Sequence, residues 1–90
     1  MGVKVIIAEA FQVAAGGIEE IETHGTSIRE CLQEAVKQAP GLQKIWLTRD
    51  GELSKYVILT MNGENVPAKD FDKKVKDGDE IFPILLIGGG

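Results

Sequence analysis

The chain closes on three glycines, Gly88, Gly89 and Gly90, directly after an apolar run at residues 81–87. Glycine loses more backbone entropy on ordering than any other residue, so this ending does not favour packing. A segment without side chains fits a narrow active site on another protein, where its terminal carboxylate is the group that reacts. Three extended residues reach roughly 10 Å. The ending therefore predicts a reactive carboxylate on Gly90, with a frayed chain end as the alternative.

Few other side chains have a spacing that suits chemistry. His24, the single histidine, has no cysteine or carboxylate at a ligand-like spacing, so we expect it at the surface or at a strand end. The single cysteine, Cys31, excludes an internal disulfide and a cysteine-cluster metal site. Glu19, Glu20 and Glu22 are expected to form a solvated acidic face, and no glycine-rich phosphate loop opens a helix. We therefore expect a protein that is not an enzyme, with no metal and no bound cofactor.

The elements that must present the glycines follow from the hydrophobic pattern. Alternation and turn residues predict strands at residues 3–8, 18–23, 56–61, 64–66 and 80–86. Asn62-Gly63 predicts a tight hairpin turn, because both turn residues must tolerate positive φ. Asp77-Gly78-Asp79 predicts a second tight turn, which leads into the last strand.

One main helix is expected near the middle of the chain. Ser27 followed by Glu30 fits a capping box, in which each side chain binds a free backbone N–H at the helix start. Apolar residues then recur at helical spacing: Ile28, Cys31, Leu32, Ala35 and Val36. Because Cys31 lies on this stripe, we expect a buried hydrophobic side chain rather than a reactive thiol. Pro40-Gly41 ends the helix.

The remaining segments are less regular, but they complete the fold class. Within residues 42–54 four apolar side chains could cover one end of the core: Ile45, Trp46, Leu47 and Leu53. A helical turn within residues 70–76 would place Phe71 and Val75 on the core. The element order predicts an α+β domain in which one helix packs across a mixed sheet of four to five strands. A parallel pairing of the first and last strands is expected.

Composition and charge limit the class of protein and the compartment in which we expect it. Ninety residues make one small domain, and 43% apolar residues are enough for a packed core. A net charge of −4 argues against non-specific binding of nucleic acid. No signal peptide is visible, and the longest apolar run is too short to span a membrane. We expect a cytoplasmic protein that is a monomer when free.

The run Asp77-Gly78-Asp79-Glu80-Ile81, followed by apolar residues and terminal glycines, resembles the ending of the small sulfur carriers of the ThiS/MoaD family. That family includes the carriers of the thiamine and molybdopterin type. The opening strand Val3-Lys4-Val5, the capped helix and a strand ending in Asn-Gly lie at the expected distances. The resemblance covers essentially the whole chain. It implies a ubiquitin-like β-grasp domain at residues 1–87 and a flexible tail at residues 88–90.

The ending departs from the family pattern in two ways. Many relatives end in Pro-Pro-Val-x-Gly-Gly or similar, whereas here Pro83 comes earlier and Ile84-Leu85-Leu86-Ile87 follows it. There is also a third glycine. If Gly88 and Gly89 are the functional pair, Gly90 must be removed. We favour Gly89 and Gly90 as the pair, because this choice requires no processing step.

The resemblance implies a chemistry for the tail. A separate adenylating enzyme of the ubiquitin-activating (ThiF/MoeB-like) type would use ATP to convert Gly90 to an acyl-adenylate. A sulfur donor would then leave a thiocarboxylate, which delivers sulfur on an acceptor enzyme, while Gly88 and Gly89 keep the tail slim. The pathway stays open among thiamine, molybdopterin, cysteine or other sulfur-containing products, and tRNA thiolation.

The last strand suggests where such partners dock. If Ile81 and Leu85 face the core, alternation places Phe82, Ile84 and Leu86 on the other face. Ile6 and Ala8 would share that outward face if the first and last strands pair. We interpret this apolar stripe as a docking surface for the adenylating and acceptor enzymes. The alternative is a central strand that is buried on both sides.

Two other functions remain open. A ubiquitin-like modifier uses the same activated glycine to acylate lysines on target proteins, and the sequence cannot separate it from a sulfur carrier. A β-grasp interaction domain without tail chemistry is the third reading. The sequence favours the sulfur carrier over both.

Overall fold

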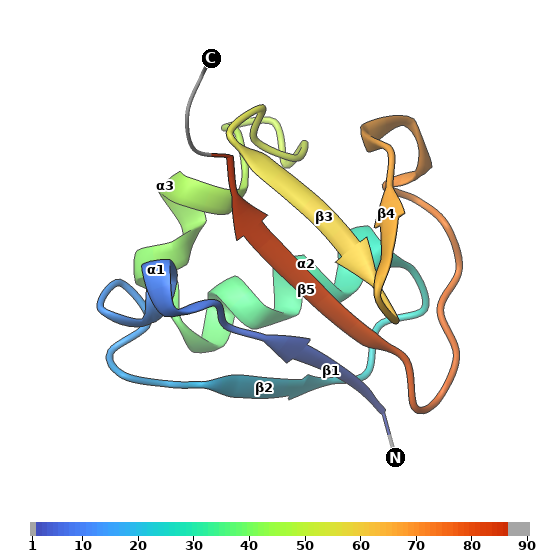
Figure 1. Ribbon diagram of the computed structural model, residues 1–90, viewed down its shortest axis with the longest axis horizontal. Helices are drawn as coiled ribbons and strands as arrows, with labels where there is room; N and C mark the ends of the chain where they lie inside the picture. Colours follow the sequence, from blue (N-terminus) through green and yellow to red (C-terminus); the bar gives the residue numbers. More distant parts are fainter. Residues whose placement is uncertain (1, 87–90) are drawn as a thin grey trace.

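The computed structural model describes residues 2–86 and shows a five-stranded mixed sheet with its main helix packed across one face (Figure 1). The strand order is β2-β1-β5-β3-β4. The elements are β1 (Val3–Ile6), α1 (Glu9–Gln12), β2 (Glu20–Thr23), α2 (Ile28–Gln38), η1 (Pro40–Leu42), α3 (Gln43–Trp46), β3 (Val57–Met61), β4 (Glu64–Val66), η2 (Ala68–Asp70) and β5 (Glu80–Leu85). No helix within these residues is long and apolar enough to cross a membrane.

The sheet contains the parallel pairing that the sequence predicts. β1 runs parallel to β5, with Val5 opposite Ile81, and antiparallel to β2. β3 is antiparallel to both β5 and β4. The turn between β3 and β4 has positive φ at Asn62 (54°) and Gly63 (84°), so the predicted Asn-Gly hairpin is confirmed. The predicted α+β fold with a mixed sheet and one main helix is confirmed.

β5 lies at the centre of the sheet although it contains Pro83, which has no N–H to donate. Asn62 donates to the carbonyl of Glu80 at 2.8 Å, and Leu86 donates to that of Tyr56 at 2.8 Å. The even-numbered residues of β5 are therefore the ones bonded to β3, and the nitrogen of Pro83 faces the β1 side. The β1 pairing covers only residues 80 and 81 of β5, so the ladder to β1 ends before Pro83.

The buried face of α2 is the predicted apolar stripe, whose residues are all buried: Ile28, Cys31, Leu32, Ala35 and Val36. The predicted capping box at the start of α2 is confirmed only in part. Ser27 Oγ accepts from the backbone N–H of Glu30 at 3.2 Å, as predicted. The Glu30 carboxylate, however, accepts from the backbone N–H and the hydroxyl of Thr26, both at 2.8 Å, rather than from Ser27. The chain before α2 turns so that Thr26 presents two donors to that carboxylate.

Two short helices were not expected from the sequence. α1 follows β1 because the buried residues change from alternation to a spacing of four, at Ile7, Phe11 and Ala15. α3 places Trp46 in the core, where its ring meets that of Phe11 edge-on with centroids 5.7 Å apart. The predicted helical turn near Phe71 begins earlier than expected, as η2 at Ala68–Asp70. Phe71 is nevertheless buried as predicted.

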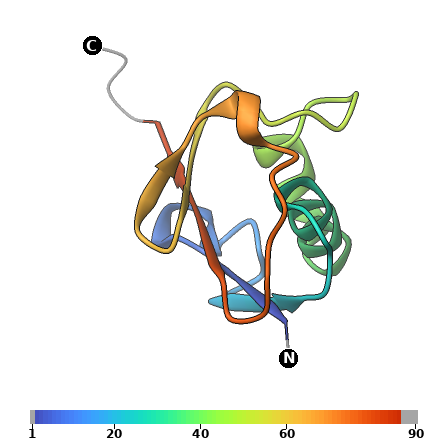
Figure 2. The same cartoon turned by 90° about the vertical axis from the view of Figure 1, so that its right-hand side faces the viewer.

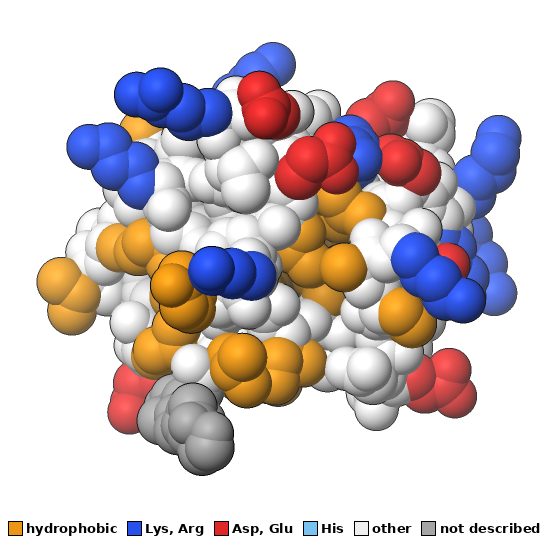
Figure 3. All heavy atoms as spheres, turned by 90° about the horizontal axis from the view of Figure 1, so that it is seen from above, with side chains coloured by type: hydrophobic (Ala, Val, Ile, Leu, Met, Phe, Trp, Pro, Cys, Tyr) orange, Lys and Arg blue, Asp and Glu red, His pale blue; other side chains and the backbone are white. Residues whose placement is uncertain are grey.

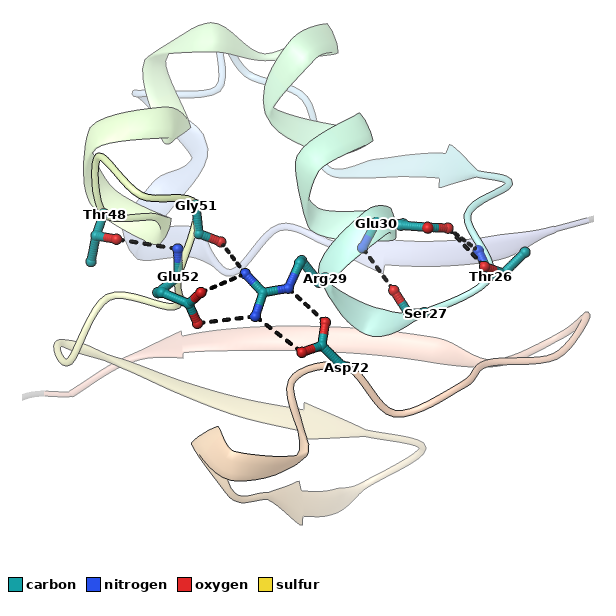
Figure 4. A network of polar contacts seen from close by, with 8 residues as sticks. All are labelled: Thr26, Ser27, Arg29, Glu30, Thr48, Gly51, Glu52 and Asp72. Atoms are coloured by element: carbon teal, nitrogen blue, oxygen red, sulfur yellow. Dashed lines mark hydrogen bonds and ion pairs between the residues drawn. The ribbon is translucent and has the colours of Figure 1, made fainter.

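Arg29 ties the start of α2 to two loops (Figure 4). Its guanidinium donates to both carboxylate oxygens of Asp72, to both of Glu52, and to the carbonyl of Gly51. The same group lies 4.8 Å from the ring centroid of Phe71. Arg29 lowers the pKa of the Asp72 carboxyl below its usual range, chiefly through the side-chain hydrogen bond. The two loops that carry these carboxylates are thereby held beside the helix.

Candidate functional site

The end of β5 is the place from which the predicted tail continues. Leu86, the last described residue, is held there by its hydrogen bond to Tyr56. Ile87 and the glycines Gly88, Gly89 and Gly90 lie outside the described residues, and so does the predicted domain boundary between residues 87 and 88. The candidate site within the described chain is therefore the surface that leads to this end.

Side chains of β5 alternate between the core and the open side of the sheet. Ile81 and Pro83 are buried, and Leu85 packs against the core. On the other side Phe82 is 36% exposed, Leu86 is 47% exposed and Ile84 is partly buried. The predicted facing of these side chains is confirmed. The alternative of a strand buried on both sides is wrong, because α2 covers only one face of the sheet (Figure 2).

Two residues near β1, Ile6 and Ala8, were predicted to extend the apolar stripe. The structure confirms the position of Ile6 and contradicts that of Ala8. Ile6 is partly buried and lines a hollow of about 340 Å³ together with Phe82 and Thr60. Ala8 does not extend the strand face as predicted. β1 ends at Ile6, and Ala8 is the N-cap of α1 and packs against the core. The change from strand to helix after Ile7 is the physical reason.

β3 contributes residues to this surface that the sequence reasoning did not include. Ile58, 36% exposed, lies opposite Ile84, and Thr60 lies opposite Phe82. Thr60 Oγ1 also donates to the carbonyl of Phe82 at 2.8 Å. These residues could have been predicted from the alternation within residues 56–61. It places the even-numbered side chains on one face once β3 is paired with β5.

We define the open face as the apolar side chains that point away from α2 on the three central strands: Ile6, Ile58, Phe82, Ile84 and Leu86. Hydrophobic side chains gather along the lower side of Figure 3, which corresponds to the front of Figure 1. Such a patch on a small protein is typical of an interaction surface. The structure thus shows an exposed apolar face, and its role in docking stays a prediction.

The turn before β5 is locked to the hairpin turn between β3 and β4. Gly78 has a φ of 91°, and the side chain of Asp79 is buried. Its carboxylate accepts from Asn62 Nδ2 at 3.0 Å and from the backbone N–H of Lys76 at 2.9 Å. The pKa of Asp79 is lowered, first by the Asn62 hydrogen bond and then by that of Lys76. This lock fixes where β5 starts, and the sequence predicted both turns but not the contact between them.

The residues that the sequence analysis considered for chemistry, His24 and Cys31, do not form one site. His24 is exposed just after β2, with its Nε2 3.9 Å from a carboxylate oxygen of Glu22. Cys31 is buried, and burial raises the pKa of its thiol. Within residues 2–86 no three His, Cys, Asp or Glu side chains gather where they could hold a metal ion.

Comparison with known proteins connects this geometry to a family. The ThiS family model matches residues 5–90. A curated relative, "Putative sulfur carrier protein" from Archaeoglobus fulgidus, is 42% identical over 50 residues. That match covers 54% of this chain and 56% of the relative, so the aligned part spans just over half of each.

Solved structures support the same fold across the whole chain. A chain in the Amycolatopsis orientalis BexX/CysO complex superposes with a TM-score of 0.82 at 24% identity, covering 99% of this chain and 100% of that one. The small archaeal modifier protein 1 (SAMP1) from Methanosarcina acetivorans superposes with a TM-score of 0.84 at 24% identity, covering 98% and 95%. At this level of identity these matches show the fold alone, which is the ubiquitin-like β-grasp. Because the family model covers nearly the full length, the chain belongs to the ThiS family of small ubiquitin-like sulfur carrier proteins.

Proposed function

We propose that the C-terminal glycine of this chain carries sulfur as a thiocarboxylate. Membership of the ThiS family supports the proposal, and so does the position of the open face beside the end of β5. The chain acts as a protein co-substrate. ATP is consumed by a partner adenylating enzyme, and no cofactor is bound by the chain itself.

The reaction follows from the weakness of a carboxylate as an electrophile. An oxygen of the Gly90 carboxylate attacks the α-phosphorus of ATP and pyrophosphate leaves, which gives an acyl-adenylate. A sulfur nucleophile at the oxidation level of hydrosulfide then attacks the acyl carbon and AMP leaves. The product is a thiocarboxylate, which is ionised at neutral pH and is a good nucleophile toward an acceptor. Every catalytic group in this sequence belongs to the partner enzymes.

The observation that carries the proposal is the open face. Phe82 and Leu86 are substantially exposed on a strand whose neighbouring residues are core, and Leu86 is the residue from which the glycine-ended segment continues. A partner that covers this face lies beside Leu86, whose backbone is held by its hydrogen bond to Tyr56. The same face would serve first the ThiF/MoeB-like adenylating enzyme and then the sulfur-acceptor enzyme.

Substitutions in the tail test the proposal. Gly89→Leu and Gly90→Leu should each abolish formation of the acyl-adenylate in an extract of the source organism supplied with ATP, because the added side chain blocks entry into a narrow site. The control is Val13→Leu, a substitution that places the same residue type at a side chain 93% exposed in the loop after α1 and leaves the tail unaltered. Thermal unfolding should be the same for all three variants. Normal adenylation and thiolation of Gly89→Leu or Gly90→Leu would show that the tail is not the working group.

A further inference from the structure

A groove unrelated to the open face lies between the β3–β4 hairpin and residues 73–76. Both segments are on the side of the molecule that faces the viewer in Figure 2. The groove has a volume of about 420 Å³. One wall is the end of the β3–β4 hairpin, and the other is the segment at residues 73–76 that leads toward β5. We name it the lysine groove after Lys73, Lys74 and Lys76, which line the second wall.

The charge of the groove is opposite to that of the chain. Lys73, Lys74 and Lys76 are exposed, and none forms an ion pair within residues 2–86. Of the two acidic residues that line the groove, Asp79 is buried and already accepts two hydrogen bonds, which leaves Glu64 as the exposed one. The protein as a whole carries a net charge of −4. Three lysines thus line one groove of an acidic protein. One of them, Lys74, also lies near Glu30, whose carboxyl pKa is lowered first by hydrogen bonds from Thr26 and then by the charge of Lys74.

Part of the floor of the groove is apolar. Val66 is buried, and Met61 and Val75 are partly buried and pack against the core. By alternation, Met61 lies on the face of β3 opposite Ile58 and Thr60, so the floor does not belong to the open face. A partly apolar floor with cationic side chains along one wall favours a ligand that has both apolar and acidic groups.

Each wall takes part in β pairing. Lys74 forms a β-bridge with Ser27, and β4 is an edge strand with β3 as its one neighbour in the described sheet. In a hairpin with a two-residue turn, the pairs Met61–Glu64 and Leu59–Val66 are the bonded ones. The backbone N–H and C=O of Asn65 therefore point away from β3, where an added strand could pair with them.

We propose that the lysine groove binds an extended acidic segment of a partner protein, in which acidic and apolar residues alternate. Alternation places one set of side chains on the apolar part of the floor and the other set toward the three lysines. A free phosphate or nucleotide matches the groove less well, because the lysines are spread along a wall and the buried, acidic Asp79 also lines the groove. This proposal does not depend on the chemistry of the glycine tail.

A peptide titration tests the proposal on the whole protein. The probe is a terminally blocked eight-residue peptide of alternating glutamate and valine, added at low salt while the backbone amide NMR signals are followed. We expect shifts confined to residues 61–66 and 73–76, which shrink as salt is added because the contact is between exposed charges. A blocked peptide of alternating lysine and valine should give no such shifts.

Matched variants distinguish binding in the lysine groove from attraction by the overall charge of the protein. The triple variant K73E/K74E/K76E should weaken peptide binding by about tenfold or more. The control K37E/K44E/K55E makes the same change in net charge at exposed lysines outside the groove and should stay within about twofold of the unaltered protein. If the triple reversal unfolds the domain, K73Q/K74Q/K76Q replaces it with the same expected direction.

Three results would overturn the proposal. Equal weakening by both triple variants would mean that only long-range charge attracts the peptide. The same shifts on adding inorganic phosphate alone would mean a small-anion site. Shifts at Phe82 and Leu86 in place of the groove would assign the peptide to the open face. None of these results bears on whether the tail is thiolated, so the two proposals fail separately.

Discussion

At the scale of single residues, the fold depends on charged side chains that the sequence shows only as turn or helix residues. Asp79 joins the turn before β5 to the hairpin turn at Asn62. Arg29 joins α2 to the loops that carry Glu52 and Asp72. Their positions follow from contacts between segments far apart in the chain. Local patterns therefore identify the turns and the helix cap, but not these links.

Replacement of Asp79 by asparagine should lower stability in a pH-dependent way. The change puts an amide NH₂ opposite one of the two donors, Asn62 Nδ2 or the backbone N–H of Lys76, and at neutral pH it should cost about 1–2 kcal/mol. The folded pKa of Asp79 is lowered, so the contribution of its carboxylate is present above the unfolded pKa of about 3.9 and is lost as pH falls through the folded pKa. The two proteins should therefore converge in acid, as measured by denaturant unfolding at pH 7 and pH 3.

Asp77→Asn is the control for that experiment. Asp77 lies in the same turn, is exposed and makes no side-chain hydrogen bond within residues 2–86. Its replacement should leave the free energy of unfolding within about 0.5 kcal/mol of the unaltered protein. Equal losses for both variants would show that the turn, and not the buried carboxylate, is responsible.

Arg29→Lys tests the clamp at the start of α2. Lysine keeps the charge but cannot form two forked pairs at once, and the Arg29 side chain is only 22% exposed. We expect a loss of about 1–3 kcal/mol in the free energy of unfolding. Arg49→Lys changes the other arginine, which is exposed and forms no ion pair in the described part of the chain, and should have little effect. An unchanged free energy of unfolding for Arg29→Lys would mean that these paired contacts do not contribute to stability.

At the scale of elements, the predictable parts are those with a strong local period. The stripe of α2, the strand pattern around β3 and β5 and the two glycine turns could all be read from spacing. α1 and α3 could not, because each has four residues and depends on the packing of Phe11 against Trp46. The early end of β1 has the same cause. It explains why Ile6 lies on the open face as expected and Ala8 does not.

The two faces of β5 should respond in opposite ways to a charge. Phe82→Lys should leave the thermal midpoint nearly unchanged and raise the carrier concentration required for half-maximal adenylation, because only the docking contact is lost. Ile81→Lys places a charge at a side chain with no exposure and should prevent stable folding. Val13→Lys is the control, since Val13 is exposed and remote from β5 in sequence. A large fall in the stability of Phe82→Lys would show that the open face is structural.

At the scale of the whole molecule, the sheet holds β5 between β1 and β3 and so fixes the point from which the last residues continue. The parallel pairing of β1 with β5 could be predicted, because the elements between them can cover the crossover, whereas the order of all five strands was not predicted. The acceptor could not be predicted, because it is selected by complementarity between two surfaces and only one of them is encoded here. The lysine groove was missed for a related reason. Its two walls come from β4 and from residues 73–76, which no local pattern brings together.

The central claim concerns the atom that Gly90 carries, and intact-mass spectrometry tests it most directly. The protein is incubated in an extract of its source organism with ATP and sulfide, then recovered and weighed. We predict a gain equal to one oxygen replaced by one sulfur, located at the C-terminal glycine by fragmentation and absent when ATP is withheld. An unchanged mass, or recovery of the chain joined through its glycine to lysines of other proteins without any thiocarboxylate, would contradict sulfur carriage.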